Sequence, residues 1–231
     1  MRDKYFNWKY VIDYFPQLLA RLPTTLMIVL VATLFGILIG ITIAFIRLER
    51  IPILQDLCKI IVSFIRGTPI LIQMFVVYYG LPAIVSLFGI NIIRWDKIYF
   101  VFVTYGINTG AYFSEVFRGA IQSVPKAQTD AALSVGLTKL QTYRRIILPQ
   151  SVIIAIPSVG TTMTGLLQDS SLAFTFGIID VIGKVNMLGG QTTHMLEGYF
   201  DAAIIFSMLT ILLEKLFSKI EAKTRYQSEI A

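Results

Sequence analysis

The amino-acid sequence predicts an all-α integral membrane protein with about five transmembrane helices. Of its 231 residues, 55% are hydrophobic and only 15% are charged, whereas a soluble domain usually carries about 25% charged residues. Long apolar runs recur along the whole chain rather than in one segment. A helix needs about 20 apolar residues to cross the hydrocarbon core of a bilayer, and these runs approach or exceed that length.

The first span is the clearest, because residues 24–46 contain no charged side chain. Within it, Gly36 and Gly40 have the four-residue spacing that lets a second helix approach closely, although glycine is also simply tolerated in membrane helices. The second apolar stretch covers residues 69–93, and Gly80 and Pro82 predict that its helix ends near Leu81. The remaining spans are predicted at residues 98–117, 149–167 and 202–213.

Residues 1–23 are predicted to form an N-terminal amphipathic segment. Apolar side chains such as Val11, Tyr14 and Leu18 recur at helical spacing, while Lys9 and Asp13 interrupt any signal-peptide core. We therefore expect three regions: this segment, a transmembrane domain over residues 24–218, and a tail over residues 219–231.

The basic residues predict the orientation of the chain in the membrane. Thirteen of the twenty Lys and Arg residues lie in the loops after spans one and three and in the C-terminal tail. Basic loops face the cytoplasm by the positive-inside rule. The N-terminus is then outside and the C-terminus is cytoplasmic, and the net charge of +6 needs no nucleic-acid partner to explain it.

The cytoplasmic loop over residues 119–149 is predicted to be structured. Thr129 could cap a helix that begins at Asp130, and Gly136 could end this helix in a left-handed turn. A second helix would lead to Pro149, which gives a compact knob that a soluble partner could grip. A simple interfacial loop is one alternative. A DNA-binding helix-turn-helix is another, but a loop between two spans leaves no room for a supporting third helix.

The same loop resembles the motif EAA, three residues, G, nine residues, I-x-L-P of bacterial binding-protein-dependent ABC transporter permeases. Asp replaces Glu at the first position, which keeps the negative charge. Three further segments resemble the polar amino-acid uptake branch of that family, and the run over residues 170–184 is similar to its L-cystine permease subgroup. The residues that match the motif are Asp130, Ala131, Ala132, Gly136, Ile146, Leu148 and Pro149. The three segments that match the branch are Arg66-Gly67-Thr68-Pro69 with Gln73, then Ala111-Tyr112 with Glu115 and Arg118-Gly119, and finally Gln168-Asp169-Ser170-Ser171-Leu172.

This resemblance implies the type I ABC importer permease fold in the cell membrane. Two permease chains, identical or sister, would span the bilayer among membrane lipid, with a dimer of ATPase subunits below and an extracellular or periplasmic amino-acid-binding protein above. The chain itself would hold no cofactor, because ATP and Mg would bind the partner ATPase. Its nearest approach to a P-loop, residues 177–185, has the wrong glycine spacing and lacks the Ser or Thr that binds magnesium. The resemblance places the coupling to the ATPase at Asp130, Ala131, Ala132, Gly136 and Leu137.

The candidates for the substrate path are polar residues in or beside the spans, where such residues are costly and therefore often functional. Asp169 could bind a substrate ammonium while the exposed N–H groups of a short helix beginning at Leu172 bind the carboxylate; a plain helix cap fits Asp169 as well. Glu115 is more simply explained as the ion-pair partner of Arg118, one turn away. The candidates are Glu115, Gln168, Asp169, Ser170, Ser171 and Gln73, with structural or gating roles expected for Arg66, Arg118 and Pro149.

No arrangement of residues in the sequence predicts an enzyme or a metal site. The single cysteine, Cys58, and the single histidine, His194, have no sequence neighbours that would complete a nucleophilic or metal-binding cluster. We therefore expect a transport subunit that imports a polar amino acid, with L-cystine as the first candidate. The alternative is a self-sufficient secondary amino-acid transporter or channel, which would favour more spans and two related halves.

Overall fold

The computed structural model describes residues 6–230, with side chains as far as residue 224, and this part of the chain contains helices and no strand. The all-α prediction is therefore confirmed. The helices, in chain order, are α1 (Trp8–Leu19), α2 (Leu22–Leu48), α3 (Leu54–Gly67), α4 (Ile70–Ser86), α5 (Lys97–Gln122), α6 (Lys126–Ser134), α7 (Lys139–Thr142), the π-helix η2 (Tyr143–Ile147), α8 (Leu148–Asp169), the 3₁₀-helix η3 (Ser170–Phe176), α9 (Val181–Thr192) and α10 (Met195–Ile230).

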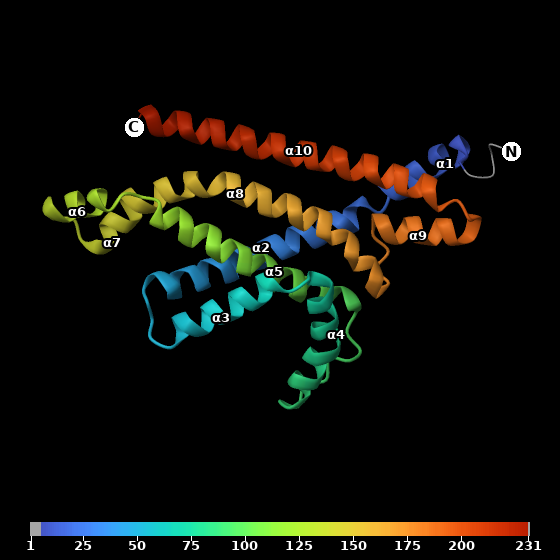
Figure 1. Cartoon of the computed structure of the whole chain (residues 1–231), viewed down its shortest axis with the longest axis horizontal. Helices are drawn as coiled ribbons and strands as arrows, with labels where there is room; N and C mark the ends of the chain where they lie inside the picture. Colours follow the sequence, from blue (N-terminus) through green and yellow to red (C-terminus); the bar gives the residue numbers. More distant parts are fainter. Residues whose placement is uncertain (1–5, 231) are drawn as a thin grey trace.

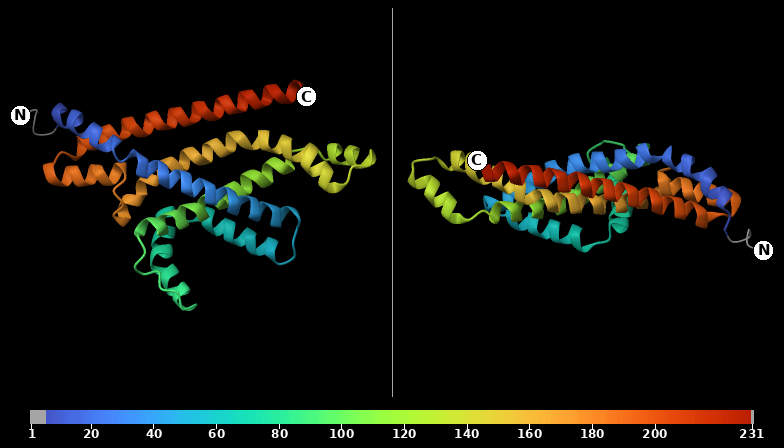
Figure 2. Two further views of the ribbon diagram at one scale, coloured as in Figure 1. Left: turned by 180° about the vertical axis from the view of Figure 1, so that it is seen from behind. Right: turned by 90° about the horizontal axis from the view of Figure 1, so that it is seen from above.

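The molecule is elongated, and its long helices run roughly along one axis. Helices α2, α5, α8 and α10 lie along this axis, with α6 and α7 at one end and α1 and α9 at the other (Figure 1). The C-terminal end of α10 lies toward the end that carries α6, as the two views of Figure 2 also show. Helix α4 turns away from the bundle.

The structure contains two or three clearly apolar membrane spans. Helix α2 and the continuous helical run Lys139–Phe176 are long and apolar enough to cross a bilayer, and α3 with α4 makes a third if this bent pair counts as one span. Helices α5 and α10 have 26 and 36 residues, which is ample length, but they carry charges. The chain is a multi-pass membrane protein. It has the predicted five spans if α5 and α10 also cross the bilayer.

The second predicted span differs from the structure. The axis bends by 115° between α3 and α4, so α4 does not continue the direction of α3. The predicted end near Leu81 is wrong, because α4 continues through Pro82 to Ser86. A proline in a helix removes one backbone hydrogen bond, but prolines are tolerated in membrane helices because neighbouring groups and local backbone adjustments satisfy the freed carbonyl. The chain turns only at Gly89, whose φ is +77°.

Helices α2 and α5 pack closely through glycine. A Cβ atom added to Gly36 would lie 2.8 Å from a methyl carbon of Thr109, and one added to Gly40 would lie 2.7 Å from Cβ of Phe113. Such distances leave no room for a side chain, so the predicted close approach at this glycine pair is confirmed and its partner is α5.

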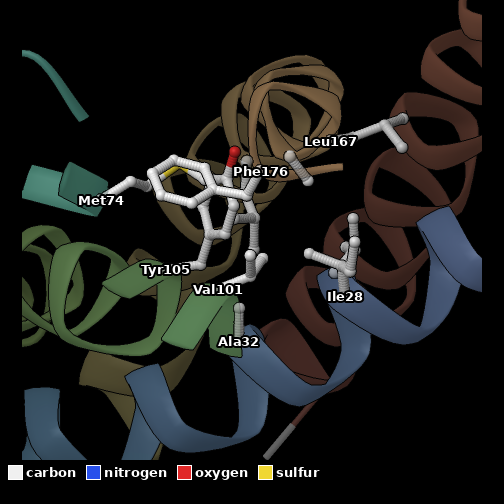
Figure 3. Close-up of a cluster of buried hydrophobic side chains, with 10 residues drawn as sticks. Ile28, Ala32, Met74, Val101, Tyr105, Leu167 and Phe176 are labelled. Carbon is white, nitrogen blue, oxygen red and sulfur yellow. The ribbon is translucent and has the colours of Figure 1, made fainter. Parts of the chain in front are cut away.

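A hydrophobic core joins α2, α4, α5, α8 and η3. Tyr105 and Val101 of α5 meet Ile28 of α2, while Leu167 and Phe176 come from the region where α8 gives way to η3 (Figure 3). Because α8 ends against this core, the polar residues that follow Leu167 are held in fixed positions.

The N-terminal segment forms the expected amphipathic helix. Tyr14 and Leu18 of α1 are buried, whereas Ile12 is exposed. The buried face packs on Val181 and Val185 of α9 and on α10. Helix α1 thus closes the end of the molecule opposite to α6.

Candidate functional site

The knob between α5 and α8 begins with a helix that is longer than predicted. Helix α6 starts at Lys126 and follows Pro125, rather than starting at Asp130. A proline fixes φ near −65°, which favours the start of a helix. Thr129 therefore lies inside α6 and does not cap it, and Asp130 sits in the second turn.

The predicted left-handed turn at Gly136 is confirmed. The φ of Gly136 is +86°. The N–H of Leu137 donates to the carbonyl of Ala132 at 3.1 Å, and the N–H of Gly136 donates to that of Leu133 at 3.0 Å. These two bonds form a Schellman motif, which ends the helix in one defined geometry.

The chain returns from this turn to the membrane in an equally defined way. Thr138 and Gln141 form a capping box at the start of α7, which satisfies N–H groups at both positions. Gln150 of α8 donates a hydrogen bond to Gln128 of α6, so the knob is fixed to the base of α8. Pro149 is the second residue of α8 and directly follows the π-helix, so the backbone N–H that proline lacks falls where the helix changes from π to α geometry.

The outer surface of the knob is apolar for a segment outside the bundle. Val135 and Leu140 are each 78% exposed, and Leu133 is 39% exposed. Asp130, Ala131 and Gly136 are also exposed, whereas Ala132 is buried. Exposed apolar side chains on a rigid element are typical of a protein-binding surface. Of the proposed coupling residues, Ala132 therefore supports the knob from inside.

Glu115 is held between two arginines. Its carboxylate accepts from Nη2 and Nε of Arg118, at 2.6 and 3.1 Å, and it pairs with Arg47 of α2 as well. The predicted pair with Arg118 is confirmed. Arg47, which lies 68 residues away along the chain, was not predicted as a partner. Both oxygens of Glu115 are occupied by the protein, so this residue links α2 to α5.

Gln73 and Arg66 stabilise the bend between α3 and α4. The amide nitrogen of Gln73 donates to the carbonyls of Ile65 and Thr68, at 2.7 and 3.0 Å, and its oxygen accepts from Asn108 at 3.1 Å. The guanidinium of Arg66 lies 5.3 Å from the centre of the Tyr112 ring, a cation–π distance. The Arg66-to-Gln73 segment is therefore a structural corner that borders α5.

A polar pocket lies between α5 and α8. Its volume is about 270 Å³, which suits a small polar solute. Asp169 is the only charged residue that lines it. Ligand sites commonly lie between the helices of a bundle and use a few placed polar groups to orient the bound molecule. The lining residues are Asn108, Thr109, Tyr112, Thr161, Thr162, Gly165, Leu166 and Asp169.

The Asp169 carboxylate makes no hydrogen bond or ion pair to any residue in the described part of the chain. Of the two roles that the sequence left open for Asp169, the helix cap is wrong, because Asp169 precedes η3 without a side-chain capping bond. The 3₁₀-helix begins at Ser170, two residues earlier than predicted. The backbone carbonyl of Asp169 accepts from the hydroxyl of Tyr105. The side chain is thus available to a ligand in the pocket.

The neighbours of Asp169 point elsewhere. Ser170 is buried and donates to the carbonyl of Leu167 at 2.6 Å, and Ser171 donates to that of Gln168 at 2.7 Å. Both hydroxyls therefore satisfy carbonyls at the end of α8. The side chain of Gln168 lines a separate groove between α8 and α10, with Glu214.

The structure brings together only some of the predicted path residues. Asp169 lines the pocket, and Gln73 reaches it through Asn108, whereas Glu115 does not line it. Asn108 and Thr161 also line the pocket and were not predicted from the sequence. The available signal was a polar residue inside an apolar run, but such residues on α5 and α8 become one site only after the helices pack.

Comparison with known proteins gives one consistent result. Residues 13–226 match the family described as "Binding-protein-dependent transport system inner membrane component". The L-cystine transport system permease protein TcyL of Bacillus subtilis (strain 168) is 38% identical, with 96% of this chain and 93% of the relative covered. The probable amino-acid permease protein YxeN of the same organism is also 38% identical, over 94% of this chain and 96% of the relative.

A solved structure supports the same assignment. A chain from a crystal structure of an amino acid ABC transporter with histidines superposes with a TM-score of 0.84 and 28% identity, covering 94% of this chain and 99% of that one. Together with the match over most of the sequence, this shows that the chain belongs to the family of binding-protein-dependent transport system inner membrane components.

Proposed function

We propose that this permease imports a polar amino acid, with L-cystine as the first candidate, and that a separate ATPase drives it. Its family makes it a transport component rather than an enzyme. The substrate class is supported by the curated relatives, which include L-cystine permeases and other amino-acid permeases, and by the Asp169 pocket.

The observation that carries the ATPase coupling is the rigid knob of α6 and α7. The Schellman motif at Gly136 and the capping box at Thr138 fix its shape, and Leu133, Val135 and Leu140 give it an exposed apolar surface. A rigid knob transmits a displacement, whereas a flexible loop would absorb it. ATP and Mg would bind the ATPase dimer, and closure of that dimer would move the knob and rock the attached α5 and α8.

The pocket supports an amino acid as the transported solute. The Asp169 carboxylate can bind an ammonium group in a charge-assisted hydrogen bond. The Asn108 amide gives one of its two N–H hydrogens to Gln73 and keeps the other for a carboxylate. The hydroxyls of Thr161 and Thr162 donate to the carbonyls of Pro157 and Ser158, and their oxygens can still accept from an ammonium group. An extracellular or periplasmic amino-acid-binding protein would deliver the solute, and a second permease chain, identical or sister, would complete the path.

The proposed orientation places the knob in the cytoplasm. Lys126, Lys139, Arg144 and Arg145 gather at the end of the molecule that carries α6 and α7, as the positive-inside rule expects for a cytoplasmic end. The N-terminus is then outside and the C-terminus inside. A self-sufficient secondary transporter or channel would have no use for the knob, and membership of the binding-protein-dependent family argues against it.

Uptake by whole cells tests the substrate. A strain that lacks this permease should lose saturable uptake of radiolabelled L-cystine and regain it when the gene is restored, with unlabelled cystine competing better than glutamine or arginine. Loss of a different amino acid would correct the substrate and leave the importer intact. Uptake that persists when ATP is depleted but collapses with the proton gradient would contradict the proposed function.

A further inference from the structure

A second cavity, an apolar groove, lies nearer the knob along α8 than the polar pocket, because its α8 residues fall within 148–159 and those of the pocket within 161–169. It has a volume of about 430 Å³ and lies between α2, α5, α8 and α10. Phe45, Phe117, Val152, Ile156 and Phe217 are among its lining side chains. The hydroxyl of Ser151, which also lines it, already donates to the carbonyl of Ile147 at 2.7 Å. Apart from Tyr143 at one end, the lining offers an amino acid no free polar partner, whereas a hydrocarbon chain would be well accommodated.

Charge gathers at one end of this groove. Leu48, Tyr143 and Leu148 form the end nearest the knob. Arg144 and Arg145 lie between Tyr143 and Leu148 on the π-helix, and Arg50 follows Leu48 by two residues. A basic rim beside an apolar groove matches the two halves of an anionic phospholipid.

The three arginines of this rim are available to a ligand. Arg50, Arg144 and Arg145 are exposed, and within residues 6–224 none of them forms a salt bridge. Arg47 is not part of this rim, because Glu115 holds it. The acidic residue near this end is Glu49, which leaves a net positive charge.

Tyr143 supplies a polar group at the boundary. Its ring lines the groove, it is half-buried, and its hydroxyl makes no hydrogen bond to another described residue. Tyrosine commonly lies at the membrane–water interface with its ring in the apolar layer and its hydroxyl at headgroup level. The hydroxyl is therefore placed to donate to a phosphate or an ester carbonyl.

We propose that this groove binds one anionic phospholipid of the inner leaflet. Its acyl chain lies between α2 and α8, and its phosphate lies on Arg144, Arg145 and Arg50. The choice of the inner leaflet rests on the proposed orientation of the chain. The lipid site and its preference for negative headgroups do not depend on whether the protein imports an amino acid. Because the groove touches the base of α8, directly after the knob, the bound lipid would support the helix that moves during transport.

Photo-crosslinking in a bilayer tests the site on the full-length chain. The purified permease is placed in phosphatidylcholine nanodiscs with a small fraction of phosphatidylglycerol that carries a photoactivatable acyl chain, and labelled peptides are mapped by mass spectrometry. Peptides from α2 and α8 that line the groove should be labelled at least fivefold more by this lipid than by photoactivatable phosphatidylcholine.

Three variants make the test specific. Arg144→Gln with Arg145→Gln should bring labelling by phosphatidylglycerol down to the level of phosphatidylcholine. Val152→Trp, at an exposed position of the lining, should fill the groove and abolish labelling by both lipids. Leu30→Trp, on an exposed part of α2 outside the groove, should change neither, and circular dichroism should show that all variants fold.

Two results would overturn the proposal. Equal labelling by the two lipids in the unchanged protein would show that the arginines select no headgroup. A groove that stays unlabelled while other lipid-facing helices react would show that protein covers it, and crosslinks between two copies of the chain would identify a second permease as the occupant. Uptake assays are not involved, so failure here leaves the proposed transport function standing.

Discussion

At the scale of single residues, Asp169 carries the proposal for substrate binding. Its carboxylate lines the polar pocket without a protein partner, so Asp169→Asn should remove the bond to the ammonium group. A charged hydrogen bond contributes about 1.5–3 kcal/mol, so the half-saturation concentration for uptake should rise roughly 10- to 100-fold. The neighbouring Ser171→Ala, which removes only a bond to a helix carbonyl, should change it less than about twofold.

The ion pairs of Glu115 with Arg47 and Arg118 lead to a prediction about the stability of the fold. Removing the charge with Glu115→Gln leaves the mostly buried Arg47, which is 11% exposed, without its counter-charge. Losing one partner of a buried ion pair typically costs about 3–5 kcal/mol, and the partial exposure here reduces the expected loss to roughly 2–3 kcal/mol. Thermal unfolding in detergent should show it. The exposed pair of Asp56 and Lys59 is the control, and Asp56→Asn should lower the free energy of unfolding by less than about 0.5 kcal/mol. Equal losses of stability in Glu115→Gln and Asp56→Asn would contradict the structure.

The buried carboxyl group of Asp180 should make the stability of the fold depend on pH. It lies outside the spanning helices and caps α9 through the N–H of Gly183 at 2.7 Å. Burial raises its pKa to about 6, although hydrogen bonds from backbone N–H groups oppose the rise. From about pH 4 to pH 6 the unfolded chain releases this proton while the folded chain keeps it, so stability falls as the pH rises, by about 3 kcal/mol.

Comparing the melting temperature at pH 4 and pH 7 checks this sign. Asp180→Asn should lose this part of the pH dependence and keep the cap. Asp96→Asn is the matched control, because Asp96 caps α5 from an exposed position through the N–H of Ile98, and it should leave the wild-type dependence unchanged. A wild-type protein that grows more stable from pH 4 to pH 6, with Asp180→Asn flat, would contradict the assignment.

At the scale of elements, the knob depends on the backbone of Gly136. A Cβ atom there would meet no neighbour within 4 Å, yet the φ is +86°. Gly136→Ala should therefore strain the turn by about 1–2 kcal/mol through the backbone alone. We expect at least a fivefold loss of uptake per ATP hydrolysed in the reconstituted transporter, and a larger loss for the bulkier Gly136→Trp.

Gly119 is a control that separates the effect of backbone strain at Gly136 from the effect of adding a side chain. A Cβ atom on Gly119 of α5 would also meet open space, at an ordinary helical φ, so Gly119→Ala should leave coupling unchanged. Gly136→Asn should be milder than Gly136→Ala, since asparagine tolerates the left-handed region better. Unchanged coupling in Gly136→Trp would remove the knob from the mechanism.

The contact of α2 with α5 makes a second prediction at this scale. Gly40→Ala would place its Cβ 2.7 Å from that of Phe113, so the two helices must separate. Overpacking of this kind costs about 1–3 kcal/mol, and the melting temperature should fall accordingly. Gly80→Ala in α4, where no atom lies within 4 Å of the added carbon, should not lower it.

The sequence predicts elements better than it predicts their ends and partners. Apolar runs locate α2, α5 and α8, and Gly136 predicts its own turn, because these signals are local. The start of α6 was wrong because Pro125 and Thr129 both favour a helix start nearby, and proline prevailed. The pairing of Glu115 with Arg47 could not be predicted, because two residues 68 positions apart meet only when α2 packs on α5. In the polar pocket, Asp169 was predicted, but Asn108 and Thr161 were not, because these residues meet only when α5 packs on α8.

At the scale of the whole molecule, the two proposed functional regions and the closed end of the bundle lie along one axis. The knob occupies one end, the polar pocket lies between α5 and α8, and α1 with α9 closes the other end (Figures 1 and 2). Helix α8 borders both the pocket and the base of the knob. This continuity allows a displacement of the knob by an ATPase to change access to the pocket.

The side of the membrane on which the knob lies tests this account most directly. Cys58 is the only cysteine and is buried, so a Cys58→Ala chain accepts new cysteines at the exposed positions Ser134 in α6 and Gln191 in α9. In intact cells a membrane-impermeant maleimide should label Gln191→Cys and not Ser134→Cys, and in inside-out vesicles the pattern should reverse. Labelling of Ser134→Cys from outside would place the knob out of reach of a cytoplasmic ATPase and contradict the account.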